Sequence, residues 1–372
     1  MTEPNLPRIP SAPSSVDIAI TGRCNLNCKY CYYADEMAAS HDLPTERWLT
    51  FFEELGNLAV QRIYITGGEP LTRPDLFELV DGIIANRMRY ALLTNGTLVT
   101  EEVLSQFEDG KRRQRLDYIQ ISVDGSRAEV HNRSRPDSFA LVVDGLRRLV
   151  ENGLPVFARV TVNRHNVDDL ENITHLLLED IGVCSFSTNE TFPCGIIERQ
   201  AEEIILTPAQ RQQAMETLTK LAALHNGRIQ ANAGPLALAR KFKKIEEALT
   251  AGETSFPGRG TLCACGSVFT KVAVNPDGTI VPCHLLDAPS MGSVGVDDLQ
   301  QIWLEHPLLD KLRRRHTIPL QTLDTCRDCP YQGFCTGGCP AVGFFLTGEL
   351  NGRNPMECYR VHKGEDPYFS LE

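Results

Sequence analysis

Hydrophobic runs and amphipathic stretches alternate through roughly the first half of the chain. Six short runs rich in β-branched and aromatic residues predict strands. They are residues 16–20, 62–66, 90–94, 118–123, 156–162 and 184–188. Between them, stretches such as 44–58, 74–86, 139–152 and 167–178 have the apolar period of a helix. Strands that alternate with helices predict an α/β fold with a parallel sheet, and six such units favour an incomplete (β/α)6 barrel of the TIM type over an open doubly wound sheet.

The pattern changes after the sixth predicted unit. Residues 207–250 are charge-rich and helical, and after Gly252 glycine and proline become more frequent. We expect a flexible tail at 1–15, a partial barrel at 16–205, a helical bridge at 206–255 and a second domain at 256–372. The run Asn275-Pro-Asp-Gly278 predicts a short β-hairpin in this domain. A helical run at 299–315 follows, with Trp303 expected in the core.

Composition and charge exclude some classes of function. Hydrophobic residues make up 42% and charged residues 23%, as is usual for globular proteins. The 37 Lys and Arg against 48 Asp and Glu give a net charge of −11, which lacks the basic footprint of a nucleic-acid binder. No apolar run approaches the ~18 residues of a membrane span, and the first residues lack the apolar core of a signal peptide. We expect a cytoplasmic protein with neither nucleic acid nor membrane as partner.

Thirteen cysteines are unusual for such a chain, and they fall into groups. Three lie between Cys24 and Cys31, and eight lie between Cys263 and Cys358. With no export signal and an odd count, short spacings favour metal or cluster ligation over disulfides. Cys184, in a predicted strand, is expected to be a small buried hydrophobe. Cys194 follows the sixth predicted strand, where a catalytic or substrate-ligating thiol and a plain loop thiol are both open.

The first group, Cys24-x3-Cys28-x2-Cys31, directly follows the first predicted strand. Three thiolates on one loop can hold three irons of a [4Fe–4S] cube and leave the fourth iron open to a small molecule. A structural zinc site would take four ligands, and His41 lies ten residues beyond Cys31. The spacing therefore favours a cluster with one open iron.

This spacing, with Tyr30 before the third cysteine, resembles the radical S-adenosylmethionine (SAM) superfamily. After the second predicted strand, Gly67-Gly68-Glu69-Pro70 is similar to the family's GGEP motif, which holds the amino group of SAM. Two glycines allow a close backbone approach, and a carboxylate suits an ammonium. The resemblance implies that Cys24, Cys28 and Cys31 are the catalytic ligands of a SAM-binding cluster.

Segments at the next predicted strand ends fit the same resemblance. Thr94 and Asn95 close the third strand, and Ser122-Val-Asp124-Gly closes the fourth and looks like the family's ISxDG segment. The resemblance implies that these residues contact SAM, with Ser122 and Asp124 facing its ribose or methionine. Arg135 matches the last position of an HDxxR pattern and would pair with the SAM carboxylate.

Other polar residues near these strand ends leave alternatives open. Asn132 stands where the HDxxR pattern has Asp, so only Arg135 is carried over, and His131 is expected to pack or cap rather than catalyse. Arg159 lies in an apolar strand and needs a partner, either a salt bridge or a bound ligand; we count it among the cofactor-binding candidates. Substrate contacts and structural roles are both open for three further residues: Asn163, Asn189 and Glu190.

The second cysteine group resembles the SPASM extension of radical SAM enzymes, which binds two auxiliary clusters. On the family's arrangement the ligands of one cluster would be Cys263, Cys265, Cys283 and Cys339, and those of the other would be Cys326, Cys329, Cys335 and Cys358. Either Cys263 or Cys265 alone matches the first position of the pattern, so ligation by both is open. A zinc ribbon of four thiolates is the alternative.

The resemblance implies a function. Three [4Fe–4S] clusters, one that binds SAM and two auxiliary, would serve an enzyme that cleaves SAM to a 5′-deoxyadenosyl radical and abstracts hydrogen from a residue of a ribosomally made precursor peptide. The product would carry a crosslink, an epimerised residue or a rearranged or excised backbone. Alternatives are anaerobic sulfatase maturation to formylglycine, a peptide-modifying step in cofactor biosynthesis, and a non-enzymatic iron–sulfur electron carrier or zinc scaffold.

The expected partners follow from this function. The substrate would be a precursor peptide, and an external donor such as flavodoxin or ferredoxin would supply electrons. About fifteen residues precede the first predicted strand, too few for a folded peptide-recognition module. We therefore expect a separate peptide-recognition protein.

Overall fold

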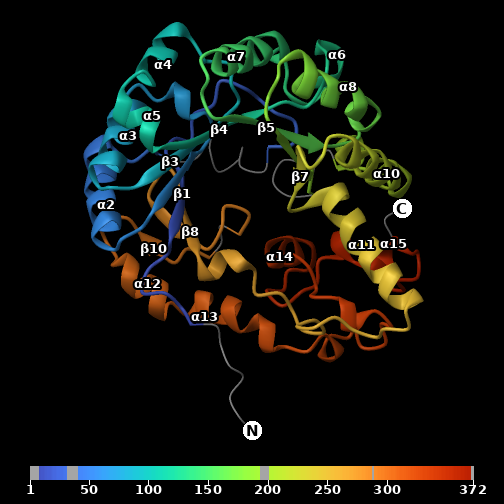
Figure 1. The fold of residues 1–372 in the computed structure, drawn as a ribbon. Helices are drawn as coiled ribbons and strands as arrows, with labels where there is room; N and C mark the ends of the chain where they lie inside the picture. Colours follow the sequence, from blue (N-terminus) through green and yellow to red (C-terminus); the bar gives the residue numbers. More distant parts are fainter. Residues whose placement is uncertain (1–7, 32–40, 193–200, 287–288, 370–372) are drawn as a thin grey trace.

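The computed structural model describes residues 8–31, 41–192, 201–286 and 289–369. The start of the expected tail and Cys194 lie outside these residues. The described chain forms a ten-stranded sheet with the order β10-β9-β8-β1-β2-β3-β4-β5-β6-β7. The end strands β10 and β7 are not paired, so the sheet curves but does not close (Figure 1). The prediction of an incomplete α/β barrel is confirmed.

The six predicted strands are all present and lie side by side, parallel, in chain order. Their bounds differ from the predicted ones by two residues or fewer at each end. They are β1 Ser15–Ala19, β2 Arg62–Thr66, β3 Arg89–Thr94, β4 Leu116–Ser122, β5 Val156–Val162 and β6 Phe186–Glu190. Their carboxyl ends therefore meet at one edge of the sheet, where the motifs of the sequence follow them.

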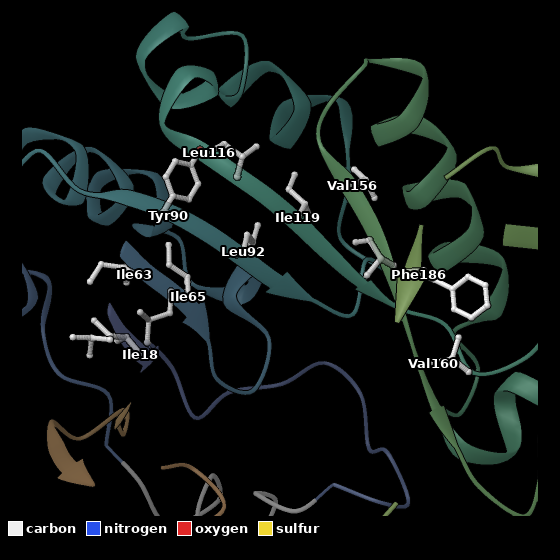
Figure 2. Close-up of a cluster of buried hydrophobic side chains, with 14 of the residues drawn as sticks. Ile18, Ile63, Ile65, Tyr90, Leu92, Leu116, Ile119, Val156, Val160 and Phe186 are labelled. Atoms are coloured by element: carbon white, nitrogen blue, oxygen red, sulfur yellow. The ribbon is translucent and has the colours of Figure 1, made fainter. Parts of the chain in front are cut away.

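Helices cover the outer side of the curved sheet (Figure 1). In chain order they are α2 Thr45–Asn57, α3 Leu76–Ala85, α4 Glu101–Gln106, α5 Gly110–Arg115, α6 Ala128–Ser134, α7 Phe139–Glu151 and α8 Leu170–His175, which continues as a π-helical turn at Leu176–Asp180. Alternate strand residues such as Ile18, Ile65 and Ile119 form the buried core beneath them (Figure 2). Because side chains alternate along a strand, the other half faces the interior of the barrel.

The expected helical bridge at 206–255 contains two long helices, α10 Pro208–Leu224 and α11 Gly234–Thr250, and also the short strand β7 Ile229–Ala231. The short helix α9 Ala201–Ile204 precedes it. Thr207 and Gln210 form a capping box that starts α10. The left-handed Gly227 turns the chain (φ 80°), after which β7 pairs with β6 in parallel. So short a strand leaves no periodic signal.

The C-terminal part extends the same sheet. The strand β8 Lys271–Val274 runs parallel to β1, and β9 Thr279–Val281 and β10 Gly292–Ser293 follow in antiparallel fashion. The predicted hairpin is confirmed, and Gly278 at its turn has a φ of 87°. Since β8 pairs with β1, the sheet continues past the expected domain boundary near residue 255; the division into domains stays a prediction.

Four helices complete the C-terminal part: α12 Leu299–Glu305, α13 Pro307–Arg314, α14 Pro340–Thr347 and α15 Tyr359–His362. The predicted helix over 299–315 is interrupted before Pro307. Proline has no backbone N–H to donate to the preceding turn, so α12 ends and α13 begins at this residue. Trp303 is fully buried as expected, and its Nε1 donates a hydrogen bond to the Pro10 carbonyl (2.8 Å). Among the described helices, none is long and apolar enough to cross a membrane.

Gly145 in α7 lets this helix contact the loop that follows β3. A Cβ at this position would lie 2.3 Å from the Gly96 carbonyl oxygen, a backbone atom that cannot move away alone. We therefore expect Gly145→Ala to lower the free energy of unfolding by about 1–3 kcal/mol, in the range of overpacked cores. Denaturant unfolding followed by circular dichroism measures it.

Gly110 is the matched control. It begins α5, its φ is not left-handed, and an added Cβ would meet nothing within 4 Å. We expect Gly110→Ala to leave the free energy of unfolding within about 0.5 kcal/mol of the wild type or to raise it slightly. Equal stability of both variants would contradict the close contact at Gly145.

Candidate active site

The loop that carries the first three cysteines follows β1 at the carboxyl edge of the sheet. Asp42 holds its start, since its carboxylate accepts hydrogen bonds from Thr21 Oγ1 (2.6 Å) and the Gly22 amide (2.7 Å). Cys24 is exposed, and Cys28 and Cys31 are partly exposed. The three thiols are thus on one anchored loop and accessible to a ligand.

Gly67 and Gly68 contact this cysteine loop. A Cβ on Gly68 would lie 2.3 Å from the Arg23 carbonyl oxygen, and one on Gly67 would lie 2.5 Å from the Thr21 carbonyl oxygen. The Gly68 amide also donates to the Thr21 carbonyl (2.8 Å). The close backbone approach that the two glycines allow is therefore to the chain's own cysteine loop, while their expected contact with a ligand stays a prediction.

Glu69 is fully buried and its carboxylate is held by three hydrogen bonds. It accepts from the Leu71 amide (3.0 Å), from Thr94 Oγ1 (2.6 Å) and from the Asn95 amide (2.7 Å). Burial raises the pKa of Glu69, and these bonds oppose the shift. Among the described residues, no Lys, Arg or His forms an ion pair with Glu69, so its carboxylate has capacity for a cationic ligand. Pro70 begins the 3₁₀ turn Pro70–Thr72, which Glu69 caps.

Asn95 ties the cysteine loop to the end of β3. Its Nδ2 donates to Asn25 Oδ1 (2.9 Å), and Asn25 Nδ2 donates to Thr97 Oγ1 (2.8 Å). The sequence analysis missed both Asn25 and Thr97. The position of Asn25 directly after Cys24 is the signal that points to it, because an amide side chain there can fix the loop without displacing a thiol.

Asp124 is the buried centre of the site. Its Oδ2 accepts hydrogen bonds from Tyr30 Oη and from Arg135 Nε (2.5 Å), and its Oδ1 accepts from the Thr161 amide (2.7 Å). Asp124 and Arg135 thus form an ion pair with each other, whereas the resemblance implied that both contact SAM. Burial raises the pKa of Tyr30 well above its usual range, so this phenol keeps its proton.

Arg135 links this pair to the cysteines. Its Nη1 lies 3.8 Å from Cys28 Sγ, and its guanidinium lies 5.3 Å from the centre of the Tyr30 ring. Burial raises the pKa values of Cys24 and Cys28, and the positive charge of Arg135 opposes both shifts. Because iron binds the thiolate, this cation favours the form of Cys28 that a cluster requires.

His131 is a packing residue that contacts the segment carrying Asp124 and Arg135. Its Nδ1 accepts from the Asp124 amide (3.1 Å), and its Nε2 lies 3.1 Å from Ser138 Oγ. That hydroxyl donates to the Arg135 carbonyl (2.7 Å). Burial lowers the pKa of His131 to about 4, so the ring is neutral and bridges the two ends of this segment.

Arg159 points into the barrel interior beside Ser122, its partner in the register of β4 and β5. Its Nε donates a long hydrogen bond to Gln120 Oε1 (3.4 Å), and no carboxylate of the described residues pairs with it. Burial lowers its pKa. Of the two expected roles, the salt bridge is absent from the described part of the chain, so the contact with a ligand stays a prediction.

Three other residues have structural positions. Glu190 is buried in an ion pair, since Arg211 Nε donates to its Oε1 (2.8 Å), so of the two open roles the structure shows a structural one. Asn163 holds the turn after β5 by accepting from the His165 amide (2.9 Å). Asn189 Oδ1 is buried and has no hydrogen-bond partner among the described residues, so its expected substrate contact stays open.

Cys184 does not fit its prediction. Its side chain is exposed, because β6 begins two residues later and Cys184 lies in the preceding loop. Its carbonyl accepts a hydrogen bond from Arg228 Nε (3.1 Å). The expectation of a small buried hydrophobe is therefore wrong for Cys184.

Four of the eight C-terminal cysteines line one cavity: Cys326, Cys329, Cys335 and Cys358. Arg353 also lines it, and its Nη1 lies 3.4 Å from Cys358 Sγ. Asp366 balances this arginine through two hydrogen bonds of 2.6 and 2.8 Å. These are the four cysteines that the resemblance assigns to one auxiliary cluster.

The other four C-terminal cysteines are Cys263, Cys265, Cys283 and Cys339. Burial raises the pKa values of Cys263, Cys283 and Cys339, and negative charge on the sulfur of Cys265 adds to each increase. The Cys265 amide donates to Cys263 Sγ (3.1 Å). Both cysteines of the pair thus lie with this group. Within the described ranges, no three His, Cys, Asp or Glu side chains are arranged to hold a single metal ion.

The low pKa of His131 makes stability depend on pH. Its folded value of about 4 lies below the ordinary 6.5, so its contribution is complete above pH 6.5 and is lost as the pH falls toward 4. We expect the wild type to lose about 1.4 kcal/mol more than His131→Gln between pH 7.5 and 5.5. Denaturant unfolding at both pH values measures this difference, and equal losses would show that His131 is not neutral in the folded state.

Comparisons with known families agree with this site. Residues 18–177 match the Radical SAM superfamily, and residues 263–330 match the SPASM iron–sulfur cluster-binding domain. The chain is 26% identical over 361 residues to AdoMet-dependent heme synthase of Methanosarcina barkeri, covering 95% of this chain and 98% of that protein. It is 26% identical over 353 residues to PqqA peptide cyclase of Ruegeria pomeroyi, covering 93% and 87%.

Solved structures share the fold. SuiB of Streptococcus suis, bound to its precursor peptide SuiA, superposes with a TM-score of 0.72 at 15% identity, covering 94% of this chain and 77% of SuiB. The protein anSMEcpe, with bound AdoMet and the Cp18Cys peptide, gives a TM-score of 0.66 at 19% identity, covering 94% and 95%. The chain therefore carries a radical SAM domain at residues 18–177 and a SPASM iron–sulfur cluster-binding domain at residues 263–330.

Proposed function

We propose that this radical SAM enzyme is a peptide maturase that abstracts hydrogen from a residue of a ribosomally made precursor peptide. The product would carry a crosslink, an epimerised residue or a rearranged or excised backbone. The observation that carries the proposal is the three-cysteine loop, held against the buried Glu69 and the Asp124–Arg135 pair. Two similar proteins support a peptide substrate, since one is a PqqA peptide cyclase and the other binds the precursor peptide SuiA.

The residues of the first site fit a [4Fe–4S] cluster with SAM, which together supply a 5′-deoxyadenosyl radical when bound. Cys24, Cys28 and Cys31 would each ligate one iron. Arg135 stabilises the thiolate of Cys28 through its positive charge. The three hydrogen bonds to Glu69 orient its carboxylate, which would accept the ammonium group of SAM.

Other residues would complete the SAM pocket. Tyr30, Gly67, Gly68, Pro70, Thr94 and Asn95 shape its rim beside the cysteine loop. Ser122 and Arg159 are neighbours on the barrel side of the sheet, and the guanidinium of Arg159 would bind an anionic group such as the carboxylate of SAM. Asp124 would act mainly through Arg135 and Tyr30, which it holds in place.

The two C-terminal cysteine groups would hold two auxiliary [4Fe–4S] clusters, which gives three clusters in all. Cys326, Cys329, Cys335 and Cys358 share one cavity, and Cys263, Cys265, Cys283 and Cys339 interact through charge. We include both Cys263 and Cys265 among the ligands because the two lie together, with the Cys265 amide donating to Cys263 Sγ. A zinc site of four thiolates remains the alternative that metal analysis decides.

The proposal extends to partners and location. The enzyme would work in the cytoplasm, receive electrons from a flavodoxin or ferredoxin, and use a separate peptide-recognition protein. Three other substrates are alternatives: a sulfatase, a peptide precursor of a cofactor, and a heme precursor. The match to AdoMet-dependent heme synthase along 98% of that protein favours the last of these.

Anaerobic turnover tests the reaction. With SAM and dithionite, we expect the wild type to release 5′-deoxyadenosine, and replacement of Cys24, Cys28 and Cys31 by Ala to reduce release by at least about a hundredfold because the cluster loses its ligands. Release is measured by liquid chromatography. Cys184→Ala is the matched control and should keep full activity, since this thiol is exposed and outside the site. Release of 5′-deoxyadenosine by the triple variant would contradict the proposed mechanism.

Mass spectrometry of a peptide encoded beside the gene, coexpressed with the enzyme, tests the substrate. We expect a loss of two hydrogens for a crosslink and a larger loss for an excision; deuterium incorporation from solvent would mark epimerisation, which leaves the mass otherwise unchanged. An unmodified peptide together with turnover of a heme precursor would replace the peptide assignment by the alternative.

Iron analysis tests the number of clusters. We expect about twelve irons per chain after anaerobic reconstitution, and about eight after replacement of Cys24, Cys28 and Cys31, because each cube holds four. Inductively coupled plasma mass spectrometry measures iron and zinc together. Zinc in place of iron, with about four irons or fewer, would rule out the auxiliary clusters.

A further inference from the structure

Arg315 is a fully buried arginine next to the cysteine group of Cys263, Cys265 and Cys339. Its Nε donates to the Cys263 carbonyl (2.9 Å) and its Nη1 donates to the Leu350 carbonyl. Its Nη2 is buried and has no hydrogen-bond partner among the described residues. Nor does any carboxylate in the described part of the chain lie within ion-pair distance of it.

A buried guanidinium without a counter-charge is costly, so its surroundings should supply one. Burial lowers the pKa of Arg315, and negative charge on the sulfur atoms of Cys263, Cys339 and Cys265 opposes this shift. An anion held by these three sulfur atoms would therefore complete the environment of Arg315.

We propose that Arg315 is the buried counter-charge of the iron–sulfur cluster held by Cys263, Cys265, Cys283 and Cys339, and that it raises the reduction potential of this cluster. The inference rests on the proposed auxiliary clusters. Reduction adds a negative charge to an anionic cluster, so a fixed positive charge nearby stabilises the reduced state more than the oxidised state.

The other charges around this group are balanced or negative. Burial raises the pKa of Cys283 and the charge of Lys271 opposes this shift, but Lys271 pairs with Asp17 (2.6 Å). Glu357 raises the pKa values of Cys263 and Cys339. Arg315 is thus the positive charge near these sulfurs that no carboxylate in the described ranges neutralises. The group of Cys326, Cys329, Cys335 and Cys358 differs, because its arginine, Arg353, is balanced by Asp366.

Arg313 is a matched control two residues away. It is also buried, it also donates to two backbone carbonyls, those of Val268 (3.0 Å) and Trp303 (2.7 Å), and its Nη2 also has no partner among the described residues. The charged group that acts on it is Asp310 rather than a cysteine. Replacement of Arg313 therefore removes a similar set of hydrogen bonds without changing the charge at the cluster.

The experiment compares Arg315→Gln, Arg315→Lys and Arg313→Gln in the full chain. All carry Ala at Cys24, Cys28 and Cys31, so that only auxiliary clusters remain. Redox titration followed by electron paramagnetic resonance gives their potentials. We expect Arg315→Gln to lower the ratio of reduced to oxidised cluster at fixed potential about tenfold, or about 59 mV for one electron, in one cluster only. Arg315→Lys, which keeps the charge, and Arg313→Gln should leave both potentials unchanged.

The outcomes separate this inference from the cluster assignment. If the variant with Ala only at Cys24, Cys28 and Cys31 holds fewer than about eight irons, the assignment of two auxiliary clusters is wrong, and the inference about Arg315 is wrong with it. Full iron with an unchanged potential in Arg315→Gln would overturn the inference alone, as would an equal shift in Arg313→Gln. If Arg315→Gln loses about four irons while Arg315→Lys keeps them, the counter-charge is supported; loss in both variants would show a packing role and overturn it.

Discussion

The ion pair between Asp124 and Arg135 is the interaction on which the candidate site depends. Through it, one buried carboxylate fixes Tyr30 beside the third cysteine, orients the guanidinium toward Cys28 and joins β4 to the Thr161 amide of β5. A buried pair is stable only when the hydrogen-bonding groups around it are satisfied. Here the neutral His131 accepts a hydrogen bond from the Asp124 amide. The cysteine loop is therefore anchored to the barrel, while its three cysteines stay at least partly exposed.

The same arrangement recurs at the other cysteine groups, with a different balance of charge. A buried arginine lies near each of the three groups: Arg135, Arg315 and Arg353. Arginine suits this position because it stays charged when buried and donates in several directions at once. A carboxylate accompanies Arg135 and Arg353, whereas Arg315 is anchored by backbone carbonyls. Each cysteine group thus has a cation nearby, and the partner of that cation differs from group to group.

The sequence alone was sufficient for the fold class, because strand–helix alternation is a local signal. The short spacings separated the first three cysteines from the C-terminal eight, whereas the division of those eight into two sets came from the family resemblance. The sequence was not sufficient for the partners of individual side chains. Arg135 and Asp124 are eleven positions apart, and nothing local shows that they bind each other before any ligand does. The burial of Glu190 depends on Arg211, and the exposure of Cys184 depends on where β6 begins. Such outcomes follow from tertiary packing, which periodicity does not encode.

The pairing of β8 with β1 has a consequence for how the chain folds. The Ser14 amide bonds to the Thr270 carbonyl across 256 positions, so the strand that precedes the first cysteine loop gains its second neighbour only when most of the chain has been made. Until then one edge of β1 presents unpaired amides and carbonyls, the kind of edge that promotes aggregation. The C-terminal part therefore covers, late in synthesis, the strand that precedes the first cysteine loop, and a shortened chain would leave that edge exposed.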